Sequence, residues 1–389
     1  MQLSHGLHLA YCTNIHRGES WNEVLTNLNT HVLDVRQQVC PNQPYAIGLR
    51  LGAAAAAELS QPNQLHTFKD WLQQHNAYVF TINGFPHGTF HGTRVKEQVY
   101  APDWTQPARL QYTKQLFHIL SKILPESVEG GVSTVPGSFK AFIHSDTQID
   151  AITQQLWECV DFLHQLQQET GHTLHLDLEP EPLCLVETTA EVVQLFDRLH
   201  AKRPNDNRLL THLRVNYDTC HLAVEFEDAK QALKTLENHG IRIGKLHLSS
   251  ALKVRPTPHT LPALQQFTDP VYLHQTVVRK PNGSLTRYAD LPEALAHAAT
   301  TTVDNEEWRI HYHIPLHAAP NQLWNTTTDH LLDVLDWLSS NPAACQHLEM
   351  ETYTWEVLPN VLATRNVVQQ LTAEYQWTLQ QLAQRKLAP

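Results

Sequence analysis

Four short segments of the sequence end in side chains that could bind a metal ion. The segments are "TLHLDLE", "LRVNYD", "IGKLHLS" and "HLEMETY", and the side chains near their ends are Glu179, Asp218, His247 and Glu351. In a β-strand every second side chain lies on the same face, and here the face that carries the acid or histidine is polar while the other is apolar. Three carboxylates and an imidazole that met at one point would repel one another without a cation. The pattern therefore predicts a divalent metal such as manganese, magnesium, cobalt or zinc.

A metal at this point would support acid–base chemistry on a hydroxylated carbonyl compound. It would polarise adjacent carbonyl and hydroxyl oxygens and lower the pKa of the carbon-bound proton between them. Glu179 and Glu351 could remove and return that proton through an enediolate. The metal, with help from His221 and Lys245, would stabilise the charged intermediate. The alternative is that the metal-binding candidates are ordinary polar residues of a barrel interior, held by their neighbours.

The elements that must position these residues alternate between short strands and longer amphipathic helices. Strand-like segments such as "LHLAYCTN", "YAIGLRL" and "YVFTING" are separated by segments with apolar spacing of three and four, for example 106–124 and 148–170. This rhythm predicts βα units and a parallel sheet. We therefore expect a single domain over residues 1–389, an α/β protein of the (β/α)8 TIM-barrel type. Its polar strand ends would lie at the C-terminal face, where such barrels build their active sites.

The rhythm breaks at residues 251–308. Within this range "VYLHQTVVRKPNGSLTRYADL" has the pattern of two strands around an Asn-Gly turn, so we predict a hairpin-containing insertion after the seventh strand. Nine strand-like segments are one too many for an eight-stranded barrel. Either residues 309–317 or residues 347–353 must close the barrel, and the sequence leaves this choice open.

Composition excludes several classes of function. The chain has 389 residues, 42% of them hydrophobic, and a formal net charge of -11, which suits a globular protein and not one that neutralises nucleic-acid phosphates. We expect no nucleic-acid partner. No stretch approaches the roughly 18 apolar residues of a membrane span, the N-terminus lacks a signal-peptide pattern and the six cysteines form no CxxC pair. These features predict a cytoplasmic protein with reduced thiols.

The loop "NGFPHGTFHGTRVKEQVYAPDW", residues 83–104, follows the third strand on the same face as the metal candidates. We expect Arg94 and Lys96 to hold an anionic group such as phosphate or carboxylate. Arg50, which ends "YAIGLR", is a further candidate for that contact; the alternative is that this single arginine has a structural role. Asn83 and His91 are expected to contact substrate, as is Lys245 on the seventh strand. The loop's glycines would let the backbone approach a ligand, and its aromatic side chains could wall a sugar-like one; the alternative is that the aromatics only pack the loop down.

A second group of histidines follows the insertion. In "HYHIPLH" His311 and His313 share one face, and with His221 they could form a second metal site. Hydrogen-bonded interior histidines are the alternative. Glu181 in "LEPEP" could serve as a base, a second metal ligand or a helix cap.

Longer motifs resemble known proteins. The order Glu, Asp, His, Glu on late strands, with "DTCHL" at residues 218–222, resembles the xylose isomerase-like TIM barrels, which include sugar isomerases, ketose 3-epimerases and apurinic endonucleases. Over nearly the whole chain "HLAYCTNIHRGESW", the loop 83–104, "LEPEPLCLVETT" and "ETYTWEVLP" resemble the EboE metabolite traffic proteins. These form a bacterial family from gene clusters that handle secondary-metabolite precursors.

The resemblance implies a xylose isomerase-like barrel whose metal ligands match Glu179, Asp218, His247 and Glu351. It also implies that His221 matches the histidine three positions after the aspartate, and that partners are encoded in the same gene cluster. The biochemical role of the family is unsettled, so its name supplies little mechanism. The aspartate that often follows the seventh-strand histidine is replaced by serines in "HLSS", which weakens the transfer of any particular substrate.

The sequence thus favours a metal-dependent isomerase or epimerase that acts on a sugar, a sugar phosphate or a cyclitol, a small anionic or polyhydroxylated metabolite. The runner-up enzyme is a phosphoesterase with two or three metals that uses His221, His311 and His313. A third hypothesis is a noncatalytic barrel that hands a metabolite to a membrane partner. One bound ion favours isomerisation and two or more favour ester hydrolysis, whereas exchange of solvent deuterium into a bound sugar distinguishes an enzyme from a carrier.

Overall fold

An eight-stranded parallel barrel is the largest element of the chain in a computed structural model that describes residues 1–91, 94–359, 362 and 365–389. The strand order is β1-β13-β7-β6-β5-β4-β3-β2, and a parallel bridge between Cys12 and Gly48 joins the two ends of the sheet. The predicted TIM barrel is confirmed. The barrel strands are β1 (His8–Tyr11), β2 (Tyr45–Arg50), β3 (Ala77–Asn83), β4 (Gly130–Thr134), β5 (Leu174–Leu178), β6 (Leu213–Asp218), β7 (Ile243–Leu248) and β13 (His347–Met350).

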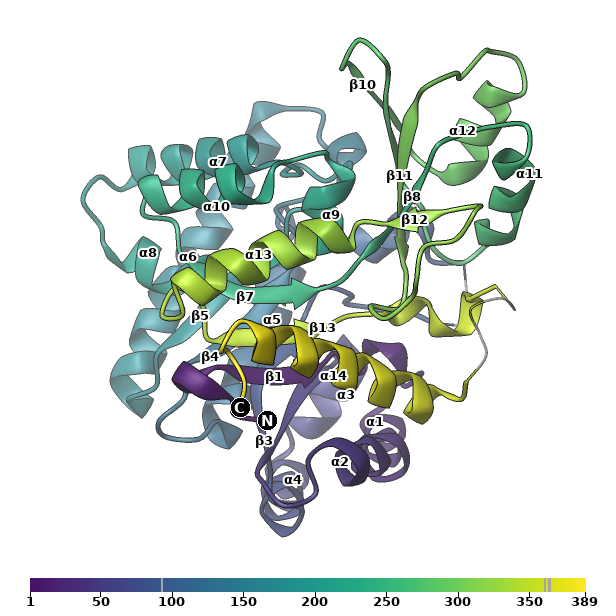
Figure 1. Ribbon diagram of the computed structural model, residues 1–389. Helices are drawn as coiled ribbons and strands as arrows, with labels where there is room; N and C mark the ends of the chain where they lie inside the picture. The colour runs from purple at the N-terminus through teal and green to yellow at the C-terminus, as the bar shows by residue number, and fades with distance from the viewer. Residues whose placement is uncertain (92–93, 360–361, 363–364) are drawn as a thin grey trace.

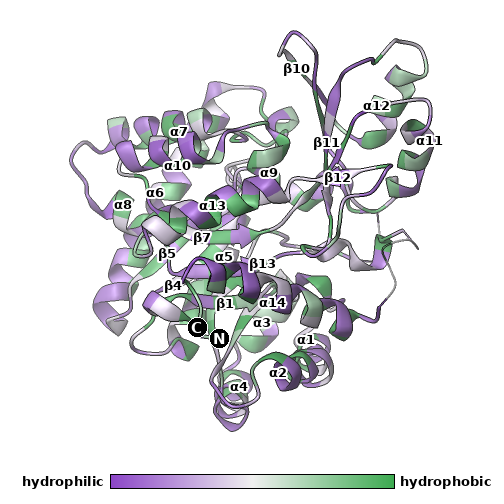
Figure 2. Cartoon of the chain, in the orientation of Figure 1, coloured by the Kyte–Doolittle hydropathy of each residue, from purple (hydrophilic) through white to green (hydrophobic). Residues whose placement is uncertain are grey.

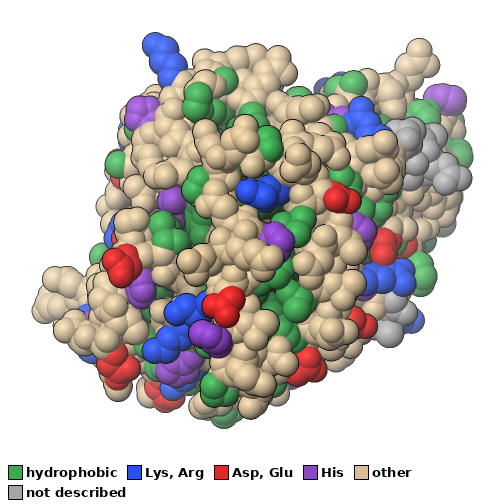
Figure 3. Space-filling model, turned by 90° about the horizontal axis from the view of Figure 1, so that it is seen from below, with side chains coloured by type: hydrophobic (Ala, Val, Ile, Leu, Met, Phe, Trp, Pro, Cys, Tyr) green, Lys and Arg blue, Asp and Glu red, His purple; other side chains and the backbone are tan. Residues whose placement is uncertain are grey.

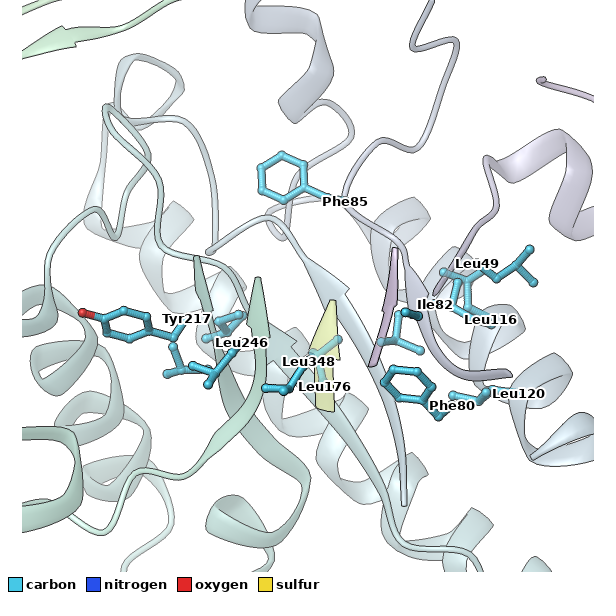
Figure 4. Close-up of a cluster of buried hydrophobic side chains, with 14 of the residues drawn as sticks. Leu49, Phe80, Ile82, Phe85, Leu116, Leu120, Leu176, Tyr217, Leu246 and Leu348 are labelled. Atoms are coloured by element: carbon cyan, nitrogen blue, oxygen red, sulfur yellow. The ribbon is translucent and has the colours of Figure 1, made fainter. Parts of the chain in front are cut away.

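Helices surround the barrel because the outward-facing residues of its strands are apolar (Figure 1). Figure 4 shows Ile82 of β3 beside Leu116, and Phe80 of the same strand beside Leu120; all four belong to the main hydrophobic core. Hydrophilic and hydrophobic residues mix around the helices, as one buried and one exposed face require (Figure 2). The helices around the barrel are α1 (Trp21–Asn27), α2 (Leu33–Val39), α3 (Ala53–Leu59), α4 (Pro62–Gln74), α5 (Pro107–Ile123), α6 (Asp146–Thr170), α7 (Thr189–Lys202), α8 (Arg208–His212), α9 (Thr219–Val224), α10 (Ala229–Asn238), α13 (Thr328–Ser340) and α14 (Val367–Gln384).

The inside of the barrel is polar along much of its length. Lys245, Glu349 and Asp177 are fully buried there, and neighbouring glycines make room for them. A Cβ atom at Gly48 would lie 1.9 Å from Glu349 Oε1, and one at Gly244 would lie 1.8 Å from Asp177 Oδ1. Larger residues at these positions would displace the interior carboxylates.

The insertion after the seventh barrel strand forms a second, antiparallel sheet beyond the C-terminal ends of the barrel strands (Figure 1). The insertion itself is confirmed, but it runs past the expected end at residue 308, because β11 and β12 both pair with β8. Its own core includes Trp308, Ile310 and Tyr312. The elements are β8 (Ala251–Val254), α11 (Thr260–Leu264), β9 (Thr276–Arg279), β10 (Leu285–Tyr288), α12 (Leu291–Ala298), β11 (Glu307–His313) and β12 (Asn325–Thr326).

The barrel is closed by β13, which settles the choice between residues 309–317 and 347–353. His347 pairs with His8 of β1, and Leu348 pairs with Leu246 of β7. Residues 309–313 instead belong to β11 of the inserted sheet.

No helix in the described ranges is long and apolar enough to cross a membrane. Basic, acidic and histidine side chains are mixed on the face of the molecule seen from below, without gathering into one basic patch there (Figure 3). All six cysteines are buried free thiols.

Candidate metal centre

The C-terminal ends of β5, β6, β7 and β13 bring the four predicted metal ligands together. One oxygen or nitrogen atom from each of Glu179, Asp218, His247 and Glu351 lies within 4.8 Å of the others, and all four side chains are buried. His247 Nδ1 lies 3.0 Å from Glu179 Oε1, 3.4 Å from Asp218 Oδ2 and 3.3 Å from Glu351 Oε2. These strand ends meet because the parallel strands run in one direction around the barrel.

The donor set fits a divalent cation. Asp218 Oδ2 and Glu179 Oε2 are buried and have no hydrogen-bond partner among the described residues, and an unpaired buried carboxylate oxygen is costly. Burial and the nearby Lys245 would lower the pKa of His247, yet the Glu351 and Glu179 carboxylates raise it well above its ordinary value. The site therefore attracts positive charge, and its oxygen-rich composition with one imidazole suits manganese, magnesium, cobalt or zinc.

Residues deeper in the barrel hold His247 in place. Its Nε2 donates a hydrogen bond to Glu349 Oε2 at 2.7 Å, which leaves Nδ1 facing the carboxylates. The same Glu349 oxygen accepts a hydrogen bond from Lys245 Nζ at 2.6 Å. A carboxylate behind a ligating histidine sets its tautomer and orientation, so Glu349 supports the site without lying in it.

Asp218 is held by the helix that follows it. It is the N-cap residue of α9, and its Oδ1 accepts hydrogen bonds from the backbone N–H groups of Cys220 at 2.7 Å and His221 at 3.0 Å. Ser249, from the "HLSS" segment, donates its hydroxyl to the same oxygen at 2.6 Å. These bonds occupy Oδ1 and leave Oδ2 for a cation.

Three histidines form a second cluster beside the first. Each Nδ1 lies against a protein oxygen that can only accept a hydrogen bond, and the pairs are His221–Pro180 at 3.0 Å, His311–Gln275 at 2.8 Å and His313–Glu351 at 2.9 Å. The hydrogen of each ring is therefore on Nδ1, and the Nε2 atoms carry lone pairs. His311 Nε2 nevertheless lies 3.1 Å from His221 Nε2 and 3.2 Å from His313 Nε2. Facing lone pairs at these distances repel unless a proton or a cation lies between them.

A pocket opens above the first cluster and reaches the second. Glu179, Glu351, His221 and His311 lie at its polar end. Glu181 also lines it; burial raises the pKa of Glu181 to about 7. Much of the remaining wall is apolar or aromatic and comes from the loop after β3, the insertion and the segment after β13; it includes Phe85, Phe90, Val95, Val99, Tyr100, Tyr272, Leu273 and Tyr353.

Neither residue of the anion clamp predicted for the loop after β3 offers a free charge to the pocket. Lys96 reaches the pocket, but its ammonium group is bound to Asp290 Oδ2 at 2.6 Å and to the carbonyl oxygens of Asp269 and Tyr272. Arg94 is exposed and lines a separate depression. Lys96 instead connects the loop to the insertion, because Asp269, Tyr272 and Asp290 all belong to the insertion.

Three other predicted substrate contacts do not reach the pocket. Arg50 is paired with Glu19 at 3.1 Å, and both ring nitrogens of His91 are used, by the Tyr272 hydroxyl and the Asn14 carbonyl. Lys245 lies below the metal ligands, against Glu349. Gly92, one of the loop glycines expected to permit close approach, lies outside the described residues.

Two asparagine side chains contact the carboxylate of Glu351. Asn83, a predicted contact, lines the pocket, and its Nδ2 lies 3.3 Å from Glu351 Oε1. Asn14, which the sequence interpretation missed, donates to the same oxygen at 2.7 Å. It follows the first barrel strand, so the rule that located the other ligands at strand ends could have found it. Glu349 was also missed, although it shares the inward face with Glu351.

Comparisons with known proteins bear on the fold. No protein-family model matches the chain, and no curated protein matches it significantly. A xylose isomerase-like TIM-barrel protein from Mycobacterium smegmatis in complex with magnesium superimposes with a TM-score of 0.55 at 10% identity, covering 99% of this chain and 100% of that one. An L-ribulose 3-epimerase gives 0.52 at 11% identity, covering 98% and 96%. The IOLI protein with a zinc atom gives 0.51 at 11% identity, covering 97% and 99%. The chain has the xylose isomerase-like TIM-barrel fold.

Proposed function

We propose that the chain is a divalent-metal-dependent isomerase or epimerase that acts on a neutral, polyhydroxylated carbonyl compound, a sugar or a cyclitol. The observation that carries this proposal is that Glu179 and Glu351 both border the pocket and both belong to the predicted metal site. The structures of similar fold include an L-ribulose 3-epimerase and proteins with bound magnesium or zinc, which supports the proposal at the level of the fold.

A bound divalent cation would supply Lewis acidity that makes a substrate proton next to a carbonyl group easier to remove. The two glutamates would move that proton. They come from β5 and β13, which are separated in the barrel by β6 and β7, so they approach a substrate from different sides. Asn14 and Asn83 hold one oxygen of Glu351, which fixes the direction of its carboxylate. One glutamate would remove the proton and the other would return it.

The lining of the pocket favours a neutral substrate. Lys96 is the only lysine or arginine among the described residues that line it, and Asp290 already neutralises its charge. A phosphate group would therefore find no free lysine or arginine side chain among the described residues of the lining. Phe85, Phe90 and Tyr353 offer aromatic faces to the C–H groups of a sugar or carbocyclic ring. We therefore favour an uncharged polyol over a sugar phosphate.

The second cluster, which consists of three histidines, favours one further candidate function. His221, His311 and His313 would bind a second cation through their Nε2 atoms, and Asp218 Oδ2, at 3.9 Å from His221 Nε2, could be shared between both ions. Two metals would offer phosphate the positive charge that the side chains lack, which suits hydrolysis of a phosphate ester. This arrangement keeps a multi-metal phosphoesterase as the second candidate.

We also infer, from the motifs, that the chain is an EboE metabolite traffic protein that works with products of the same gene cluster. A noncatalytic barrel would need the same pocket but no proton transfer. The experiments below therefore test proton transfer and metal number separately.

Proton transfer is tested by incubating the manganese-loaded protein with neutral ketohexoses and inososes in deuterium oxide, followed by mass spectrometry. We expect one deuterium next to the carbonyl group of the compound that is a substrate. Glu351→Gln should abolish this exchange and retain most of the bound metal. Glu356→Gln, in the next turn of chain and paired with exposed Arg17, is the matched control. Saturable binding of a compound without exchange would favour a carrier.

Metal number is tested by elemental analysis of protein purified without a histidine tag. An isomerase requires only one ion per chain at Glu179, Asp218, His247 and Glu351. If two ions are found and His313→Ala removes only one of them, the histidine cluster is a metal site and the phosphoesterase gains support. Hydrolysis of p-nitrophenyl phosphate by the two-metal form would then overturn the isomerase proposal if deuterium exchange is absent.

A further inference from the structure

A second polar pocket lies at the opposite end of the barrel from the metal centre. It opens where β4, β5, β6, β7 and β13 begin, and its polar side chains include Glu129, His175, Arg214, Arg242 and His347. Arg214 and Asp218 lie four residues apart on β6. At roughly 3.3 Å per residue the two sites are about 13 Å apart along the strand, so this pocket is not part of the metal centre.

Several buried side chains in this pocket have polar atoms without a partner. Arg214 is only 3% exposed; its Nη1 donates to Glu129 Oε2 at 2.7 Å, while its Nη2 has no hydrogen-bond partner among the described residues. His347 Nδ1 and His175 Nε2 are likewise buried and unpartnered in the described part of the chain. Buried polar atoms are normally satisfied. Arg214 Nη2 can only donate a hydrogen bond, so its lack of a partner indicates a ligand with an acceptor atom.

The charge of the pocket indicates which ligand it would take. Arg214 and Arg242 are positive, and Glu129 is the one acid that borders the cavity among the described residues. Burial, together with neighbouring charges, holds the pKa of His175 and of His347 well below the ordinary value, so neither ring adds charge. Asp177 lies deeper and is hydrogen-bonded to His175 Nδ1 at 2.6 Å. The described lining therefore holds two guanidinium groups against one carboxylate, and Arg214 Nη2 is a donor without a partner.

We propose that this pocket binds a small oxyanion, a phosphate or a carboxylate group, between the guanidinium groups of Arg214 and Arg242. A guanidinium group offers two parallel N–H donors that match two oxygens of such an anion. Glu129 holds Arg214 through Nη1 and leaves Nη2 without a partner among the described residues. The site goes beyond the proposed function, because neither metal ligands nor substrate-pocket residues take part in it.

The proposal is tested by calorimetric titration of the full chain with inorganic phosphate and, separately, with acetate, after metal has been removed with EDTA and the chelator dialysed away. We expect saturable binding of one anion per chain. Arg214→Met should weaken it about tenfold or more, the usual effect of losing a charge-assisted hydrogen bond. Arg242→Met should also weaken it, and because Arg242 is exposed this variant keeps the test informative if Arg214→Met does not fold.

Two controls separate this site from the metal centre. Asp218→Asn changes the proposed metal site, and Arg198→Met removes an exposed arginine on α7; both should bind phosphate as the unmodified chain does. Binding of phosphate or of acetate alone supports the proposal and identifies the class of oxyanion. It is overturned if neither anion binds saturably, if both arginine variants bind normally, or if Asp218→Asn abolishes binding.

Discussion

Replacing Glu349 by glutamine tests how the barrel interior holds His247. The carboxylate of Glu349 accepts hydrogen bonds from Lys245 Nζ at 2.6 Å and His247 Nε2 at 2.7 Å, and all three side chains are fully buried. Burial raises the pKa of Glu349, but Lys245 and His247 lower it to about 2, so this group is an anion. Glutamine keeps the shape and one acceptor oxygen but removes the charge, which leaves the Lys245 ammonium buried without a counterion.

The expected loss of stability follows from that uncompensated charge. Removing one partner of a buried ion pair typically costs about 3 to 5 kcal/mol. With about 2.1 cal/mol/K of unfolding entropy per residue, a chain of 389 residues should melt about 4 to 6 °C lower. The assay is thermal unfolding followed by circular dichroism in EDTA, with Glu356→Gln as the control that should change little.

The double variant Lys245→Met with Glu349→Gln separates lost charge pairing from lost packing. It no longer contains the unpaired ammonium group, so it should recover at least half of the lost stability. Its affinity for manganese should stay about 10- to 100-fold below that of the unmodified chain, because His247 still lacks the carboxylate that orients it. A double variant that is no more stable than Glu349→Gln alone would refute the argument.

Three further changes test other parts of the structure. Asp218→Asn keeps the acceptor that caps α9 but removes the charge of the oxygen facing the metal site. Elemental analysis should find that manganese occupancy is sharply reduced, while the melting temperature in EDTA stays nearly the same. Unchanged occupancy would exclude Asp218 as a ligand. Gly48→Ala should lower the free energy of unfolding in urea by about 1 to 3 kcal/mol, because the new Cβ would lie 1.9 Å from a carboxylate oxygen of Glu349. Gly88→Ala is the control and should lower it far less, because no atom lies within 4 Å of its Cβ position. Equal losses for the two variants would contradict this reasoning. Burial raises the pKa of Glu374 from 4.5 to about 7, so the folded chain keeps a proton that the unfolded chain releases, and stability should fall by up to about 3 kcal/mol as pH rises from 4.5 to 7. Glu374→Gln should remove that part of the pH dependence in urea unfolding at pH 5 and pH 8, and an unaltered slope would show that Glu374 ionises normally.

The sequence alone was enough to predict the barrel and the meeting point of four side chains. Both follow from local rules. A strand alternates its faces, so the polar residues of "LRVNYD" or "IGKLHLS" had to share one side. Parallel strands end at one face of a barrel, so Glu179, Asp218, His247 and Glu351 were expected to converge once the βα rhythm was recognised.

Only the tertiary structure decided which charges are free. Lys96 and Asp290 are far apart in the sequence and meet because the insertion folds over the loop after β3. Arg50 likewise pairs with Glu19, a residue distant from it in the sequence. A lysine or arginine in a glycine-rich loop has the same local pattern whether its partner is a ligand or a distant carboxylate. The sequence could therefore not show that Lys96 is already paired with Asp290.

The closure of the barrel was decided in the same manner. Residues 309–313 and 347–350 are both short segments with alternating polar residues, and nothing local distinguishes them. His347 pairs with His8 and Leu348 with Leu246, whereas β11 pairs with β8 in the inserted sheet. The alternation of polar and apolar residues predicts which side chains of a strand share a face. It does not predict which strand pairs with which, because that pairing depends on the path of the whole chain.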